Sequence, residues 1–160
     1  MRQGYGPVVE FSESVTQGVA LAEGEPRAEI VLAAEPSSLS TARCFVTSML
    51  ELWDREDPEQ IAPLLTSEIV ANALRHATGR IGLELSLRNS EELRVRVRDE
   101  TPDAPVIPRS SPDGIGGHGL TIIEALARSW GVERYEDCKV VWFETPVSPR
   151  APRAVAAAHR

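Results

Sequence analysis

The feature of this sequence that most constrains its fold is a pair of neighbouring segments in which apolar and polar residues alternate. Residues 81–88 (IGLELSLR) and 93–99 (LRVRVRD) each place an apolar side chain at every second position. The link between them, residues 89–92 (NSEE), is typical of a turn. Because successive side chains of a strand point to opposite faces, the alternation predicts an antiparallel hairpin with one face on a core and one in water.

Three other segments have the spacing of helices. Residues 36–38 (PSS) offer serine hydroxyls as caps and precede an apolar stripe that ends near Trp53. A second helix is expected to begin near residues 57–58, an acidic cap followed by proline, and to run through IAPLLTSEIVANALRHA. Pro63 lies deep for a first-turn proline, so the start of this helix is either shifted or kinked. A third helix is expected over residues 120–130 (LTIIEALARSW).

Strands complete the order of elements. A short strand is expected over residues 28–34, and two more over 131–136 (GVERYE) and 139–145 (KVVWFET). Strands therefore run in pairs and helices are grouped, which predicts an α+β fold and argues against a doubly wound sheet. We expect a two-layer α/β sandwich, in which a mixed, mostly antiparallel sheet is covered on one face by three helices. This single domain would span residues 28–146, between flexible tails at 1–27 and 147–160.

Charge and composition argue against some classes of function, although they leave room for a local basic patch. The net charge of −7 argues against direct binding to nucleic acid or to anionic membranes, which carry charge of the same sign. No apolar run approaches the roughly 20 residues that span a bilayer, and no signal peptide is recognisable. Cys44 and Cys138 have neither metal-ligand spacing nor a disulfide pattern, so we expect reduced thiols in a cytoplasmic protein.

Two polar residues extend the apolar face of the second predicted helix. Ile61, Leu65, Glu68 and Asn72 follow one another at spacings of four, three and four. An inward carboxylate and amide are costly without partners, which a cation and phosphates would supply. The amide oxygen of Asn72 suits Mg²⁺, and Glu68 could accept a proton from an attacking hydroxyl. Alternatively, the helix is rotated and both residues lie at its wet edge.

Asp99 is the second candidate. It shares the parity of Leu93, Val95 and Val97, so it is expected to face inward at the end of its strand. A carboxylate there could accept a hydrogen bond from an exocyclic amine such as that of adenine. A carboxylate that only caps the following turn is the alternative.

A glycine-rich segment is the third candidate. In residues 113–123 (DGIGGHGLTII), Gly116, Gly117 and Gly119 precede an apolar helical run. Glycines let the backbone approach a ligand closely, and a helix start offers free N–H groups to phosphate. The segment is neither a P-loop nor a dinucleotide fingerprint, because no Gly-Lys-Ser/Thr follows and no strand precedes it.

Together, in this order and on these elements, the three candidates resemble the N-box, G1-box and G2-box of the histidine-kinase-like ATPase (GHKL, or Bergerat) superfamily. Within it, the chain resembles the stand-alone anti-sigma-factor serine/threonine kinases and their actinobacterial relatives. The resemblance covers roughly residues 28–146, and four phrases carry it: SEIVANALRHA, VRVRDETPDAP, GGHGLTIIEALARSWGV and KVVWFE.

The resemblance implies roles for single residues. Asn72 would be the Mg²⁺ ligand, Glu68 the general base and Asp99 the adenine-binding aspartate of an ATP site. Arg75 and His76 either reach the phosphates or are an ordinary solvated arginine and helix histidine. A lid over residues 102–115 would cover the phosphate-binding residues, which would be Gly116, Gly117, His118, Gly119, Leu120 and Thr121. Alternatively, Thr121 only caps the first turn of its helix.

The chain departs from the family pattern at two positions. The family usually has a small residue two positions after the aspartate, where this chain has Thr101, whose hydroxyl could bond adenine or water. It usually turns through glycine before the last strand, where this chain has Cys138. Neither change removes a group that Mg-ATP needs, but both bear on affinity.

The resemblance implies an ATP-binding anti-sigma factor that phosphorylates a serine or threonine of an anti-sigma antagonist. Its partners would be that antagonist and a sigma factor, and a homodimer is implied. A noncatalytic module, in which ATP only orders the lid for a partner, is the first alternative. A detached histidine-kinase domain is the second, and residues 1–27 are too short and polar for its phosphoacceptor helix.

Overall fold

The computed structural model describes residues 8–11, 15–20, 24–76, 79–101 and 118–152. Their elements, in chain order, are β1 (Val8–Phe11), β2 (Val15–Ala20), β3 (Arg27–Leu32), α1 (Ser38–Leu52), β4 (Arg55–Glu56), α2 (Ile61–His76), β5 (Ile81–Arg88), β6 (Glu92–Asp99), α3 (His118–Leu126), β7 (Ser129–Arg134), β8 (Lys139–Pro146) and β9 (Ser148–Pro149). From β3 onward the main elements follow the predicted order, and β4 and β9 are short additions.

Seven strands form one sheet in the order β1-β2-β3-β5-β6-β8-β7. Every ladder in the described part of this sheet is antiparallel, where the sequence led us to expect a mixed, mostly antiparallel sheet. The register places Asp99 of β6 between Ile81 of β5 and Lys139 of β8. Because directly opposed residues point to the same face, these three side chains share one side of the sheet.

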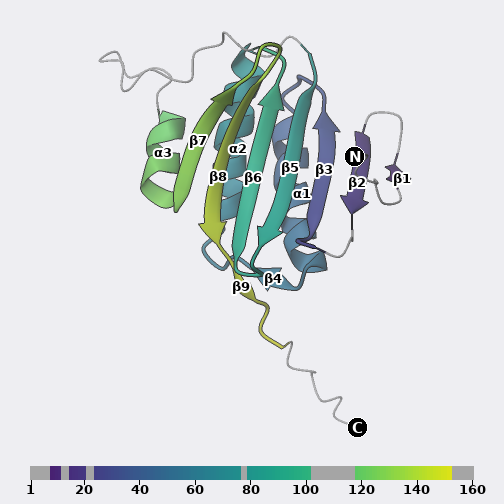
Figure 1. Cartoon of the computed structure of the whole chain (residues 1–160), viewed down its shortest axis with the longest axis vertical. Coiled ribbons are helices and arrows are strands. Elements are labelled where there is room, and N and C mark those ends of the chain that lie inside the picture. Colours follow the sequence, from purple (N-terminus) through teal and green to yellow (C-terminus); the bar gives the residue numbers. More distant parts are fainter. Residues whose placement is uncertain (1–7, 12–14, 21–23, 77–78, 102–117, 153–160) are drawn as a thin grey trace.

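The helices cover one side of the sheet. Figure 1 shows α1 and α2 behind the strands, with α3 beside the edge strand β7. The core lies between these layers and includes Val46 of α1, Leu65 and Ile69 of α2, and Leu85 and Val95 of the sheet. The predicted two-layer α+β sandwich is therefore confirmed.

The alternating segments form the central hairpin as predicted. Leu83 and Leu85 of β5 and Val95 and Val97 of β6 are buried, whereas the polar residues between them are partly or fully exposed. Asn89, at φ 49°, begins the turn in the left-handed region, which asparagine tolerates better than most residues.

Helix α1 begins at Ser38, as the sequence indicated, but without the predicted serine cap. The hydroxyl of Ser37 donates to Glu35 Oε1 at 2.6 Å and that of Ser38 donates to the carbonyl of Ala33 at 2.6 Å. Both hydroxyls therefore stabilise the preceding turn and leave the free N–H groups of the helix start to other partners.

Helix α2 begins at Ile61, three residues later than the proline of the predicted start. The acidic cap is present, because the backbone N–H of Ala62 donates to Asp57 Oδ2 at 2.7 Å. Pro63 then lies in the first turn, where its missing N–H costs nothing. Of the two alternatives, the shifted start is correct.

Helix α3 ends at Leu126, earlier than predicted, and Trp130 belongs to β7. The N–H of Ala127 still donates to the carbonyl of Ile123 at 2.8 Å. The N–H of Arg128 instead donates to the backbone carbonyl of Glu144 in β8 at 2.8 Å. Pairing with β8 thus overrides the helical pattern of residues 127–130.

Both expected tails are partly ordered. β1 and β2 extend the sheet beyond β3, whose edge would otherwise present unpaired backbone groups. At the other end, Val147 is buried and donates to the carbonyl of Glu91 at 2.9 Å, and β9 pairs with β4. The boundaries predicted for the domain and its tails stay a prediction, and residues 1–7, 12–14, 21–23 and 153–160 lie outside the described residues. No described helix is long and apolar enough to cross a membrane.

Candidate functional site

Asp99 ends β6 on the helix-covered side of the sheet, as its parity predicted. Its side chain is 2% exposed, and its Oδ1 accepts the backbone N–H of Thr101 at 2.9 Å. Its Oδ2 lies 3.3 Å from Nζ of Lys139, which is 0% exposed. The carboxylate therefore both caps the following turn, as the alternative interpretation had it, and forms a buried ion pair.

Asn72 lies on the buried side of α2, in its last two turns. The residue is 4% exposed, and its Oδ1 has no hydrogen-bond partner among the described residues. A buried polar atom without a partner is uncommon and costly. Glu68, one turn earlier, is half-buried, so the helix directs the amide further inward than the carboxylate. The interpretation that both lie at a wet edge is wrong for Asn72.

A hydrogen bond joins the end of α2 to the end of β6. The hydroxyl of Thr101 donates to the backbone carbonyl of His76 at 3.2 Å, while the N–H of Thr101 donates to Asp99. Asn72 is one helical turn before His76, so the structure brings Asn72 and Asp99 to the same end of the sandwich. Thr101, a departure from the family pattern, provides this link.

The third predicted component is only partly described. Helix α3 begins at His118, so His118, Gly119 and Leu120 form its first turn, and the helix packs against α2. Arg75 and Thr121 are exposed. Gly116, Gly117 and the predicted lid over residues 102–115 lie outside the described residues. Phosphate binding at the start of α3 therefore stays a prediction.

Lys139 is a buried neighbour of Asp99 that we did not predict from the sequence. It directly opposes Asp99 in the β6–β8 ladder. The signal was present, because Lys139 shares parity with Val141 and Phe143, both of which are buried. Val140 next to Val141 obscured the alternation, and a lysine at a strand start is usually solvent-exposed.

The described residues fit a magnesium ion that is held largely by a nucleotide. They contain no group of three or more His, Cys, Asp or Glu side chains that could hold a metal alone. The unpartnered Oδ1 of Asn72 is a neutral oxygen of the kind that Mg²⁺ accepts. Mg²⁺ usually keeps several waters and takes further ligands from substrate phosphates, so one protein oxygen is sufficient.

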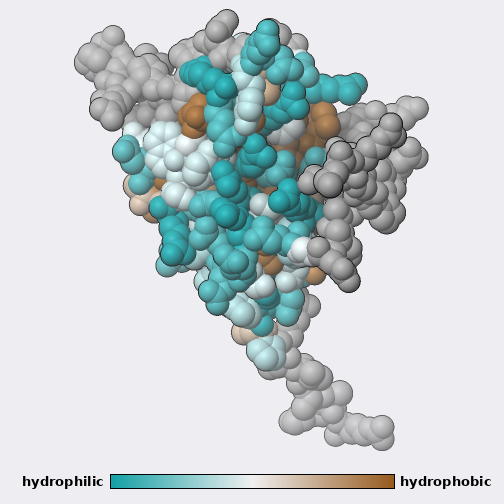
Figure 2. Space-filling model, viewed as in Figure 1, coloured by the Kyte–Doolittle hydropathy of each residue, from teal (hydrophilic) through white to brown (hydrophobic). Residues whose placement is uncertain are grey.

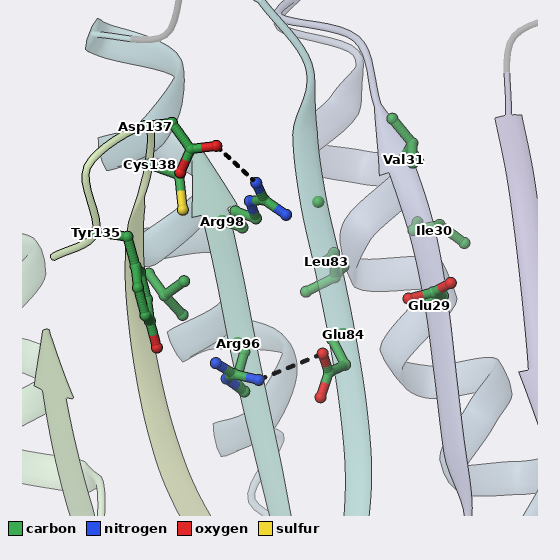
Figure 3. A pocket seen from close by; sticks show the side chains of 12 residues that line it. Glu29, Ile30, Val31, Leu83, Glu84, Arg96, Arg98, Tyr135, Asp137 and Cys138 are labelled. Carbon is green, nitrogen blue, oxygen red and sulfur yellow. Dashed lines mark hydrogen bonds and ion pairs between the residues drawn. The ribbon is translucent and has the colours of Figure 1, made fainter. Parts of the chain in front are cut away.

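The opposite side of the sheet is polar, as Figure 2 shows. It contains a shallow hollow of about 500 Å³, to which Asn72, Asp99 and Lys139 do not contribute. Figure 3 shows the hollow, in which Arg96 contacts Glu84 at 3.5 Å and Arg98 contacts Asp137 at 3.8 Å.

The carboxylate of Glu133, on the same side of the sheet, also has hydrogen-bond and ion-pair partners. Tyr135 donates to Glu133 Oε2 at 2.8 Å, and Arg96 lies 3.2 Å from the same oxygen. The hydrogen bond from Tyr135, assisted by the charges of Arg96 and Arg94, lowers the pKa of Glu133 below its usual value. Since these charged groups already partner one another, the hollow offers little to a charged ligand.

Comparison with known proteins agrees with this geometry. The family profile described as "Histidine kinase-like ATPase domain" matches residues 32–145, which include α2, β6 and the start of α3. The chain belongs to this family.

Among solved structures, the chain is similar to the crystal structure of the RsbU and RsbW domains of Rv1364c from Mycobacterium tuberculosis. The TM-score is 0.56 at 20% sequence identity, over 78% of this chain and 34% of that one. The chain thus spans about a third of that protein's crystallised length, and at this identity the likeness concerns the fold. No curated protein matches the chain.

Proposed function

We propose that the chain binds Mg-ATP between α2, β6 and α3 and transfers the γ-phosphoryl group to a serine or threonine of an anti-sigma antagonist, while it also binds a sigma factor. The observation that carries the proposal is the buried, unpartnered Oδ1 of Asn72 at the same end of the sandwich as Asp99. Membership in the histidine kinase-like ATPase family supports it, as does a fold similar to about a third of the crystallised RsbU and RsbW domains of Rv1364c.

Each described residue has a separate task in this proposal. Asp99 would accept a hydrogen bond from the adenine amine, Thr101 keeps Asp99 in place, and Asn72 would hold the Mg²⁺ ion. Mg²⁺, when bound, neutralises charge on the phosphate oxygens. The predicted residues Gly116 to Thr121 would cradle those oxygens with backbone N–H groups.

Glu68 provides the proton acceptor for transfer. Its carboxylate would take the proton of the acceptor hydroxyl as that oxygen bonds to the γ-phosphorus. The bond from phosphorus to the β–γ bridging oxygen breaks, and ADP leaves with the electron pair. The half-buried position of Glu68, one turn before Asn72, leaves its carboxylate reachable from solvent, as a protein hydroxyl requires.

A noncatalytic module is the second candidate, because family membership and a buried Asn72 are equally expected if ATP only orders the lid for a partner.

Phosphoryl transfer separates these candidates. The full chain would be incubated with γ-labelled Mg-ATP and purified antagonist proteins, and the labelled residue identified by mass spectrometry. We expect one labelled serine or threonine with the wild type, and loss of at least about 100-fold in rate with Glu68→Gln, which keeps the shape of the side chain. Glu59→Gln, an exposed carboxylate before α2, is the matched control and should leave the rate unchanged. ATP binding without transfer to any protein would support the noncatalytic module.

A further inference from the structure

The buried ammonium of Lys139 has donors that the described residues leave unused. Its Nζ is 3.3 Å from Asp99 Oδ2 but makes no hydrogen bond within the described part of the chain. An ammonium has three donors, and a lysine is almost never completely buried without full partners. The residue therefore has more bonding capacity than its ion pair uses.

A structural role alone does not account for this residue. Asp99 already has a hydrogen bond from the backbone of Thr101 on its Oδ1, and neighbouring inward positions of β8 are apolar. Replacing a buried ion pair with apolar side chains is often neutral or stabilising, so packing does not require a lysine here. The charge is better explained by a ligand that uses it.

The pair presents an acceptor beside a donor. Asp99 Oδ2 accepts and Lys139 Nζ donates, and the two atoms lie 3.3 Å apart at the end of two paired strands. The edge of adenine carries the reverse pattern on two nitrogens bonded to the same carbon, C6: the amino group at N6 is a donor and N1 is an acceptor. One planar edge can therefore satisfy both side chains at once.

We propose that Lys139 reads the N1 atom of the purine, by donating to it while Asp99 accepts from N6. The proposal rests on the nucleotide site proposed above and deepens it, because it assigns a second base-reading residue and a ligand class, the 6-aminopurine nucleotides. Guanine has a carbonyl oxygen, which could accept from Lys139, and an N1–H, which could donate to Asp99. The test therefore includes a guanine nucleotide.

Calorimetric titration of the full chain with Mg-ATP, Mg-GTP and Mg-1-deaza-ATP tests the proposal. In 1-deaza-ATP a C–H group replaces N1, while the N6 amine is retained. We expect the wild type to bind 1-deaza-ATP at least about 10-fold more weakly than ATP, the usual loss for one charge-assisted hydrogen bond. Lys139→Met should bind ATP about as weakly as the wild type binds 1-deaza-ATP, and should bind the two nucleotides equally.

Arg98→Met is the matched control, because Arg98 precedes Asp99 on the opposite, exposed side of β6. It should retain the wild-type preference for ATP over 1-deaza-ATP. A thermal unfolding curve without nucleotide establishes whether Lys139→Met is folded. The comparison of ATP with 1-deaza-ATP in the wild type tests the proposal even if the variant does not fold.

The outcomes are distinct. Equal wild-type affinity for ATP and 1-deaza-ATP, or an unchanged preference in folded Lys139→Met, overturns the role of Lys139 and leaves the nucleotide site intact. Tighter binding of GTP than of ATP overturns the assignment to 6-aminopurines. No binding of any nucleotide overturns the proposed function itself, and this inference with it.

Discussion

The two sides of strand β6 carry charges with very different surroundings. On the open side, Arg96 contacts two carboxylates, Glu84 and Glu133, whose side chains are partly exposed, and Arg98 contacts the exposed carboxylate of Asp137. On the helix-covered side, one carboxylate, Asp99, faces one ammonium, Lys139, and both are buried. Removal of one partly exposed charge costs little, whereas removal of one member of a buried pair leaves the other charge without compensation. The nucleotide site proposed above lies on the side that holds the buried pair.

The largest expected difference between the two sides concerns removal of one charge. Lys139→Ala leaves Asp99 buried without its ion-pair partner, and we expect a loss of about 3–5 kcal/mol in the free energy of unfolding. Arg98→Ala, next to Asp99 in sequence but exposed, should change it by less than about 1 kcal/mol. Urea denaturation of both variants measures this. Similar losses in the two variants would contradict the proposed difference between the two sides of β6.

Apolar packing should show the same asymmetry on β5. Leu85→Ala removes a completely buried side chain, and we expect a loss of about 2–5 kcal/mol. Glu84→Ala, the preceding residue on the open side, should cost less than about 1 kcal/mol because its contact with Arg96 is partly exposed. Thermal and urea unfolding measure the loss in the free energy of unfolding for both variants. Equal losses would argue against a core on one side of the sheet only.

The open side should respond to salt. Arg96→Ala removes contacts to Glu84 and Glu133, and we expect a loss below about 1 kcal/mol at low ionic strength. Near 1 M salt, where screening acts over about 3 Å, the difference from wild type should vanish. The loss for Lys139→Ala should persist in the same salt series, because buried pairs are screened much less.

Acid should produce the smallest effect. The pKa of Glu133 is lowered in the folded state, chiefly by the hydrogen bond from Tyr135. Its contribution is therefore present above the ordinary glutamate pKa, near 4.3, and is lost as the pH falls through the lower folded value. In Glu133→Gln the free energy of unfolding should depend less on pH in this range. The difference from wild type should be less than about 1 kcal/mol, since solvent screens the group. Urea denaturation at several pH values from about 6 to 3 measures this. If the free energy of unfolding falls with acid equally in the variant and the wild type, Glu133 does not contribute in this way.

The sequence predicted what depends on local periodicity. Alternation in residues 81–88 and 93–99 determines which side of each strand is buried, and the same parity predicted that Asp99 lies on the inner side. The stripe through Ile61 and Leu65 likewise placed Asn72 inward. These features follow from chain geometry and need no knowledge of distant contacts.

What the sequence did not predict depends on contacts between distant segments. Lys139 is buried because β8 lies beside β6, and Trp130 leaves the helical pattern because β7 pairs with β8. The strand at residues 15–20 pairs with β3 and the strand at 8–11 pairs with it in turn, and both show little periodicity of their own. Tertiary pairing overrides local preference at each of these places.

The central claim is that the end of the sandwich at Asn72 and Asp99 binds Mg-ATP. Calorimetric titration of ATP, with and without Mg²⁺, into the wild type, Asp99→Asn and Asn72→Ala tests it most directly, with Arg98→Met as the control for the open side. We predict binding by the wild type and the control, its loss in folded Asp99→Asn, and loss of the Mg²⁺ dependence in Asn72→Ala. No binding by the wild type at millimolar ATP, or undiminished binding by Asp99→Asn, would contradict the claim.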